Sequence, residues 1–140
     1  MASRPAVMFV CVHNAGKSQM AAALMRHLAR DRVEVHSAGT DPGTEVHDLS
    51  AVAVAELGAD MSAETPRAVD VELLARMDRV IVVGTHAEAA PVGETSVALE
   101  TWLIDDPSTR GVEGMDRVRI MRDDIAARVR VLVAQLCPDE

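Results

Sequence analysis

The sequence predicts an α/β fold: a single three-layer domain in which a four-stranded parallel sheet has helices on both faces. Short apolar segments alternate along the chain with segments whose apolar residues recur every three or four positions, a pattern typical of strands joined by helical crossovers. The run from Ala6 to Val12 is continuously apolar, as expected of a strand buried on both faces. A chain of 140 residues is the size of one ordinary domain, so we expect residues 1–140 to form a single unit.

The other elements follow from their apolar period and from the residues that end them. Asp48 and Asp70 are suited to cap the N-termini of helices. The last helix has the strongest period, and its arginines and aspartates between residues 116 and 130 are expected to form a solvated face. The expected strands are residues 6–12, 33–36, 79–83 and 96–99, the expected helices are 18–30, 49–57, 71–76 and 118–136, and loops are expected at 37–43, 85–96 and 102–114.

Composition limits the compartment and the partners. The net charge of −8 disfavours nucleic acid and acidic membranes as partners. No apolar run approaches the roughly 20 residues that cross a bilayer, and the residues before Ala6 lack the features of a secretory signal. We therefore expect a cytoplasmic protein. The two cysteines, Cys11 and Cys137, cannot form a disulfide framework, and no zinc-type spacing occurs, so no metal site is expected.

The chemistry of the chain is concentrated in the loop that follows the first strand, which reads CVHNAGKS. In a parallel sheet, ligands bind beyond the carboxyl ends of the strands, near the N-termini of the following helices. Backbone N–H groups of such a loop can surround a tetrahedral oxyanion, and Lys17, the single lysine of the chain, adds positive charge. The same field favours the thiolate of Cys11, which makes it the candidate nucleophile. The expected oxyanion-binding residues are Val12, His13, Asn14, Ala15, Gly16, Lys17 and Ser18.

Two of these residues are also expected to shape the loop. Ser18 can donate a hydrogen bond to the thiolate, and Asn14 can hold the loop with its side-chain amide.

Two other interpretations of the loop remain open. It differs by one residue from a nucleotide-binding GxxxxGKS motif, although Gly84 closes the strand where an acidic magnesium ligand would be needed. Alternatively, Cys11 is an inert buried thiol.

The loop and several later segments together resemble a known family. Phe9-Val10-Cys11 with the stretch HNAGKSQMA, Ser37-Ala38-Gly39-Thr40 and Asp106-Pro107 resemble the arsenate reductases built on the low-molecular-weight tyrosine phosphatase fold. In finer detail the chain resembles the actinobacterial arsenate–mycothiol transferases, in segments 58–62, 72–74, 78–80, 98–102 and 119–123. The resemblance implies that Cys11 is the catalytic nucleophile, Asp106 the general acid, and Lys17 a catalytic cation. Lysine stands where the wider superfamily has arginine, and it lacks the two-pronged fork of a guanidinium.

The resemblance implies an activity and its partners. The enzyme would couple arsenate to a low-molecular-weight thiol, mycothiol, as cosubstrate and without a tightly bound cofactor, and a glutaredoxin-like mycoredoxin would carry out the following step. Residues 85–96 contain no cysteine that could resolve an arsenic adduct internally, which favours an external thiol. Cys137 is expected to be an incidental exposed thiol.

Two alternatives to arsenate reduction remain. One is a low-molecular-weight phosphatase that acts on a phosphorylated protein or a small ester. The chain has no tyrosine, and Ser108-Thr109 stands where phosphotyrosine phosphatases place aromatic residues, so a phosphotyrosine ring would be poorly held. The other is a non-catalytic oxyanion-binding or sensor protein.

Overall fold

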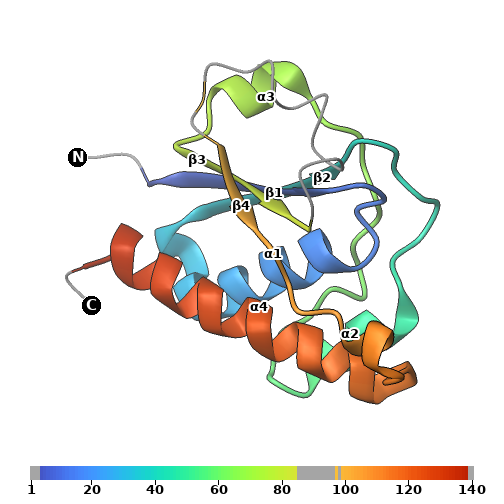
Figure 1. Cartoon of the computed structure of the whole chain (residues 1–140). Coiled ribbons are helices and arrows are strands. Elements are labelled where there is room, and N and C mark those ends of the chain that lie inside the picture. The colour runs from blue at the N-terminus through green and yellow to red at the C-terminus, as the bar shows by residue number, and fades with distance from the viewer. Residues whose placement is uncertain (1–3, 85–96, 98, 139–140) are drawn as a thin grey trace.

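The first strand, residues 6–11, lies in the interior of the sheet and pairs with a strand on each side. In the computed structural model, which describes residues 4–84, 97 and 99–138, four parallel strands lie in the order β2-β1-β3-β4 (Figure 1). Among these residues no helix is long and apolar enough to cross a bilayer. In chain order the elements are β1 (Ala6–Cys11), α1 (Lys17–Ala29), the 3₁₀ helix η1 (Arg30–Arg32), β2 (Glu34–Gly39), α2 (Asp48–Ala55), α3 (Val71–Ala75), β3 (Arg79–Val83), β4 (Leu99–Trp102), the 3₁₀ helix η3 (Pro107–Arg110) and α4 (Gly114–Leu136).

Every residue of β1 is buried, because helices cover both faces of the sheet. Successive side chains of a strand point to opposite faces. Val7 and Phe9 therefore enter the core formed with α1, α2 and α4, while Met8 and Val10 enter a smaller core that includes Leu74 of α3. Figure 1 shows α3 on one side of the sheet and the other three helices on the opposite side. The predicted three-layer α/β architecture is confirmed.

The strand boundaries differ from the predicted ones where pairing overrides local sequence. β2 extends into the loop predicted at 37–43, as far as Gly39, because parallel pairing with β1 runs from Glu34 opposite Ala6 to Gly39 opposite Cys11. The strand predicted at 96–99 overlaps β4 only at Leu99. Helix α4 begins four residues before the predicted start. The loop predicted at 85–96 lies outside the described residues.

Of the two predicted helix caps, one is confirmed and one is wrong. Asp70 caps α3 as expected and accepts hydrogen bonds from the backbone N–H groups of Glu72 and Leu73. The capping position of α2 is His47 rather than Asp48, and no side chain caps it. Asp106, by contrast, caps η3 by accepting the N–H of Ser108, with proline following at the first position.

The predicted solvated face of α4 is wrong at Arg122. This residue is 8% exposed, and its guanidinium donates to the carbonyl of Ala53 at 2.9 Å and to Glu56 at 2.6 Å. Arg119 donates to the same Glu56 carboxylate at 3.0 and 2.7 Å. The two arginines therefore fasten α4 to the C-terminal end of α2, and the hydrogen bonds from Arg119 and Arg122 lower the pKa of Glu56 to about 2.

Replacing Phe9 by alanine should destabilise the fold strongly. Phe9 is fully buried, and its ring lies 5.6 Å from that of Trp102, centre to centre. Truncation of a buried phenylalanine leaves a cavity and costs about 3–5 kcal/mol, to be measured by urea unfolding. Phe9→Leu, which keeps most of the volume, should cost much less. A loss below about 1 kcal/mol for Phe9→Ala would contradict the central position of this ring.

The Glu56 carboxylate should make stability depend on pH in acid. Because its pKa falls from the ordinary 4.5 to about 2 in the folded protein, its contribution is complete above pH 4.5 and is lost as the pH falls towards 2. The difference in thermal midpoint between the unmodified protein and Glu56→Gln should therefore shrink across this interval. Glu72→Gln, an exposed position on α3, is the control. A difference that is constant from pH 5 to pH 2 would contradict the assignment.

Candidate active site

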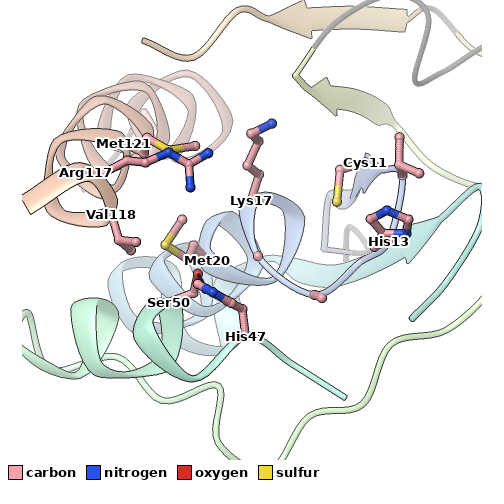
Figure 2. Close-up of a pocket in the computed structure, with 12 residues that line it drawn as sticks. Cys11, His13, Lys17, Met20, His47, Ser50, Arg117, Val118 and Met121 are labelled. Carbon is pink, nitrogen blue, oxygen red and sulfur yellow. Dashed lines mark hydrogen bonds between the residues drawn. The ribbon is translucent and has the colours of Figure 1, made fainter. Parts of the chain in front are cut away.

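A cavity of about 270 Å³ lies at the carboxyl end of β1. It is several times larger than the roughly 30 Å³ that one water occupies in the liquid. Figure 2 shows the loop after β1 on one side of this cavity and α4 on the other, with the start of α2 below. This is the edge at which a parallel sheet of this order binds ligands. The lining residues are Cys11, Val12, His13, Ala15, Gly16, Lys17, Met20, His47, Ser50, Arg117, Val118 and Met121.

The loop turns its backbone N–H groups inward, because its carbonyl groups are bonded on the outside. The carbonyl oxygens of residues 11, 12, 13 and 15 accept hydrogen bonds of 2.7–3.1 Å from the N–H groups of residues 40, 41, 43 and 47. In a trans peptide the C=O and the next N–H point in opposite directions, and the described chain has no cis peptide. The N–H groups of Val12, His13, Asn14 and Gly16 therefore face away from segment 40–47, towards the inside of the loop.

A chain of hydrogen bonds behind the cavity wall ends on the sulfur of Cys11. Asn14 Nδ2 donates to Ser18 Oγ at 2.7 Å, and Ser18 Oγ lies 2.9 Å from Cys11 Sγ. Because the Ser18 oxygen already accepts from Asn14, its own hydrogen is available to point at the sulfur. A donor in that position stabilises a thiolate. Asn14 and Ser18 are both fully buried, so their side chains support the loop from behind and are not among the cavity-lining groups.

Asn14 is itself fixed from three directions. Its Oδ1 accepts from the backbone N–H of Arg67 at 3.0 Å and from Gln19 Nε2 at 3.2 Å. Its φ of 51° lies in the left-handed region, which asparagine tolerates better than most residues. Gly39 must stay small beside it, because a Cβ there would lie 2.5 Å from the carbonyl oxygen of Val12. The loop geometry therefore depends on residues from β2 and from the segment before α3.

The cavity is positively charged in a protein of net charge −8. Lys17 and Arg117 line it together with two histidines, and no carboxylate is among the described lining residues. Helix α1 begins at Lys17, so the N–H groups of its first turn and the positive end of its dipole lie at the same place. Donors and charges of this kind suit an oxyanion.

Asp106 lies outside the cavity lining, bound to a residue that belongs to it. Arg117 donates from Nε and Nη2 to the two carboxylate oxygens of Asp106, both at 2.9 Å. This fork, together with the N–H of Ser108, holds the pKa of Asp106 well below its usual range. The resting structure therefore holds the carboxyl group ionised, and its predicted role as an acid requires a change in this pair.

The second cysteine is far from the first. Cys137 follows α4, twenty positions after the cavity-lining Arg117, which corresponds to about 30 Å along a helix. It is half-buried rather than exposed as expected. Within the described ranges no group of histidine, cysteine or acidic side chains is arranged to hold a metal ion.

Sequence reasoning identified the loop and missed the opposite wall of the cavity. Val12, His13, Ala15, Gly16 and Lys17 line the cavity with Cys11, and their binding of an oxyanion stays a prediction. Arg117 was assigned to the solvated face of α4, and it was not singled out from the other arginines of that helix by any local pattern. His47, whose Nδ1 lies 3.1 Å from Ser50 Oγ, was also missed. The remaining unpredicted lining residues are Met20, Ser50, Val118 and Met121.

Comparison with known proteins agrees with this geometry. The model of the low molecular weight phosphotyrosine protein phosphatase family matches residues 6–139, and the chain belongs to that family. Within it, the chain falls in the arsenate reductase branch. It is 37% identical to a putative arsenate reductase of Halobacterium salinarum, over 94% of this chain and 93% of the relative, and 34% identical to an arsenate reductase of Shouchella clausii, over 91% and 94%.

Solved structures show the same similarity. A thioredoxin-dependent arsenate reductase of Corynebacterium glutamicum superposes with a TM-score of 0.78 at 30% identity, covering 100% of this chain and 66% of that longer chain. An arsenate reductase described in its phosphate-binding state superposes with a TM-score of 0.77 at 27% identity, covering 94% of this chain and 98% of the other. A tyrosine phosphatase of Erwinia amylovora, at 15% identity and a TM-score of 0.79, shares the fold, with 97% and 95% of the two chains covered.

Replacing Ser18 by alanine should slow the reaction of Cys11 with an alkylating agent. The variant lacks the hydrogen bond to the sulfur, and a hydrogen bond to a charged group contributes about 1.5–3 kcal/mol, so the alkylation rate at pH 7 should fall by about tenfold or more. The measurement is made with Cys137→Ser in both proteins so that only Cys11 reacts. Ser37→Ala, another buried serine, is the control. An unchanged rate would show that Ser18 does not act on the thiolate.

Proposed function

We propose that this protein reduces arsenate with the help of a low-molecular-weight thiol, mycothiol, which it joins to arsenate as a thiol–arsenate adduct in arsenic detoxification. The observation that carries the proposal is the isolation of Cys11. It is a single thiol at a positively charged cavity, and the one other cysteine of the chain follows α4, about 30 Å along that helix from the cavity-lining Arg117. A second sulfur must therefore come from outside the chain.

The chemistry begins with arsenate held by the loop N–H groups and Lys17. An arsenic–sulfur bond forms while an arsenic–oxygen bond breaks, and the oxygen leaves as water after Asp106 supplies a proton. Either Cys11 attacks arsenic and is then displaced by the thiol, or Cys11 organises the site while the thiol attacks directly. Arsenic stays pentavalent in the adduct.

The reduction itself belongs to a following step. A thiol of a glutaredoxin-like mycoredoxin attacks the sulfur of the adduct, a mixed disulfide forms, and the electron pair of the broken arsenic–sulfur bond leaves with arsenic as arsenite. Two electrons are thus transferred and two thiols are consumed. The relative from Corynebacterium glutamicum is a thioredoxin-dependent arsenate reductase, so a protein dithiol is the competing source of sulfur. The cytoplasm, where thiols are kept reduced, is the compartment that this chemistry favours.

A phosphatase activity is the second candidate, because phosphate and arsenate share tetrahedral geometry and charge. One related arsenate reductase is described with phosphate bound. The apolar part of the cavity is lined by Met20, Val118 and Met121 rather than by aromatic rings, which disfavours phosphotyrosine as a substrate. A sensor without catalytic activity is the third candidate, and it predicts that Cys11 can be replaced without loss of function.

Mass spectrometry of arsenate incubated with the protein and candidate thiols tests the proposal. We expect a mycothiol–arsenic adduct whose rate of formation falls by about a thousandfold or more in Cys11→Ser, as for other removed nucleophiles. Cys137→Ser, which removes the distant thiol, should leave the rate unchanged. Adduct formation that survives in Cys11→Ser contradicts the proposal and favours the sensor.

Two comparisons separate the remaining candidates. Arsenite released with thioredoxin and no small thiol would favour the protein dithiol. Hydrolysis of a phosphate ester without any thiol, faster than the arsenate reaction, would favour the phosphatase.

A further inference from the structure

Arg117 both lines the cavity and binds Asp106. Its guanidinium lines the cavity that contains Cys11 and Lys17, and the same guanidinium is forked onto the carboxylate of Asp106. Figure 2 shows it reaching from α4 towards Lys17, with Cys11 on the far side of that lysine. The side chains of Arg117 and Asp106 are 33% and 35% exposed, so neither is locked in place by packing.

The loop lacks the group that Arg117 carries. Lys17 offers a single nitrogen, whereas a guanidinium offers two parallel N–H donors that match two oxygens of a tetrahedral anion. In the part of the chain that the structure describes, Arg117 is the one arginine among the cavity-lining residues. A fork for the anion can therefore come from α4, across the cavity from the loop.

We propose that Arg117 changes partner when the cavity fills: it releases the Asp106 carboxylate and forks onto the bound oxyanion. A phosphate or arsenate ion near neutral pH carries up to two negative charges against the one of Asp106, and it lies where Lys17 and the end of α1 already draw anions. After release Asp106 still accepts the N–H of Ser108 as the cap of η3. The inference rests on the proposed use of the cavity for an oxyanion, and it is independent of which thiol takes part.

The exchange would also change what Asp106 can do. While Arg117 is bound to it, the carboxyl has a pKa well below its usual range and holds no proton. When the guanidinium turns to the anion, the chief cause of that low pKa is removed at the moment when a proton donor is needed. Arrival of the substrate would then prepare the acid, and the resting ion pair and the proposed acid role are two states of one residue.

The chain supplies a matched control for this proposal. Arg110 donates to both carboxylate oxygens of Asp105 at 3.0 Å, in the same segment between β4 and α4 as Asp106, and neither residue lines the cavity. Changes at this pair alter the net charge as changes at Arg117 and Asp106 do, and they leave the fork between Arg117 and Asp106 intact; the charge of Arg110 acts on Asp106 only at longer range.

Titration of inorganic phosphate into the intact protein by calorimetry tests the exchange. Arg117→Gln should weaken phosphate binding by about tenfold, the effect of losing a charge-assisted fork, and Arg117→Lys should recover only part of it. Asp106→Asn, which removes the competing carboxylate, should tighten binding by up to about fivefold, the contribution of a half-exposed ion pair. That tightening should disappear when Asp106→Asn is combined with Arg117→Gln. Arg110→Gln and Asp105→Asn should leave binding unchanged, and thermal unfolding checks that each variant is folded.

Three results would overturn the exchange. They are unchanged binding in Arg117→Gln, weaker binding in Asp106→Asn, and equal tightening by Asp106→Asn with and without Arg117, which would indicate simple charge repulsion. Failure of the unmodified protein to bind phosphate or arsenate is a different result, because it would remove the proposed function itself.

Discussion

The structure of the site depends on one buried amide. Asn14 is completely inaccessible, and its two polar atoms connect the segment before α3, the first turn of α1 and, through Ser18, the sulfur of Cys11. Its left-handed φ also makes the turn by which the chain leaves β1 and enters α1. An amide can do this because it donates from one end and accepts at the other, whereas an aspartate in the same place could only accept. The Asn14 side chain therefore donates to Ser18 and accepts from the segment before α3 at the same time.

An acidic protein has kept its anion cavity basic by placing its carboxylates elsewhere. Three carboxylates that lie just before α4 or on it are paired with arginines: Asp106 with Arg117, Asp105 with Arg110, and Asp124 with Arg128. Such half-exposed pairs add little to stability. Their effect on the site is larger, since each neutralises a negative charge that would otherwise repel an oxyanion. The arginine-rich helix α4 thus shapes the field at a loop about a hundred residues away in sequence.

The fold was predictable because its signals are local, and half of the site was not because its signals are distant. The continuous apolar run of β1 and the period of α4 determine strand and helix without reference to the rest of the chain, and the loop after β1 contains its own chemistry. Arg117 and Arg122 have no such signal. Both sit among similar arginines, and only the packing of α4 against α1 and α2 decides which one faces the cavity, which is buried, and which is solvated. The end of β2 was missed for the same reason, since pairing with β1 carries a Gly-containing segment into the sheet.

The number of thiols that the reduction consumes can be compared with the single thiol, Cys11, at the cavity. Reduction of arsenate to arsenite takes two electrons, and each disulfide that supplies them consumes two thiols. With the second cysteine at the far end of α4, the chain can place at most one thiol at the cavity, so the proposed reaction needs room for another beside the oxyanion. The cavity is larger than one anion requires, and its surplus is bounded by Met20, Val118 and Met121. Thioether and branched aliphatic side chains are soft, adaptable neighbours for an incoming sulfur. In the proposed reaction the chain therefore supplies one thiol at the cavity, and the second thiol that the reduction consumes comes from another molecule.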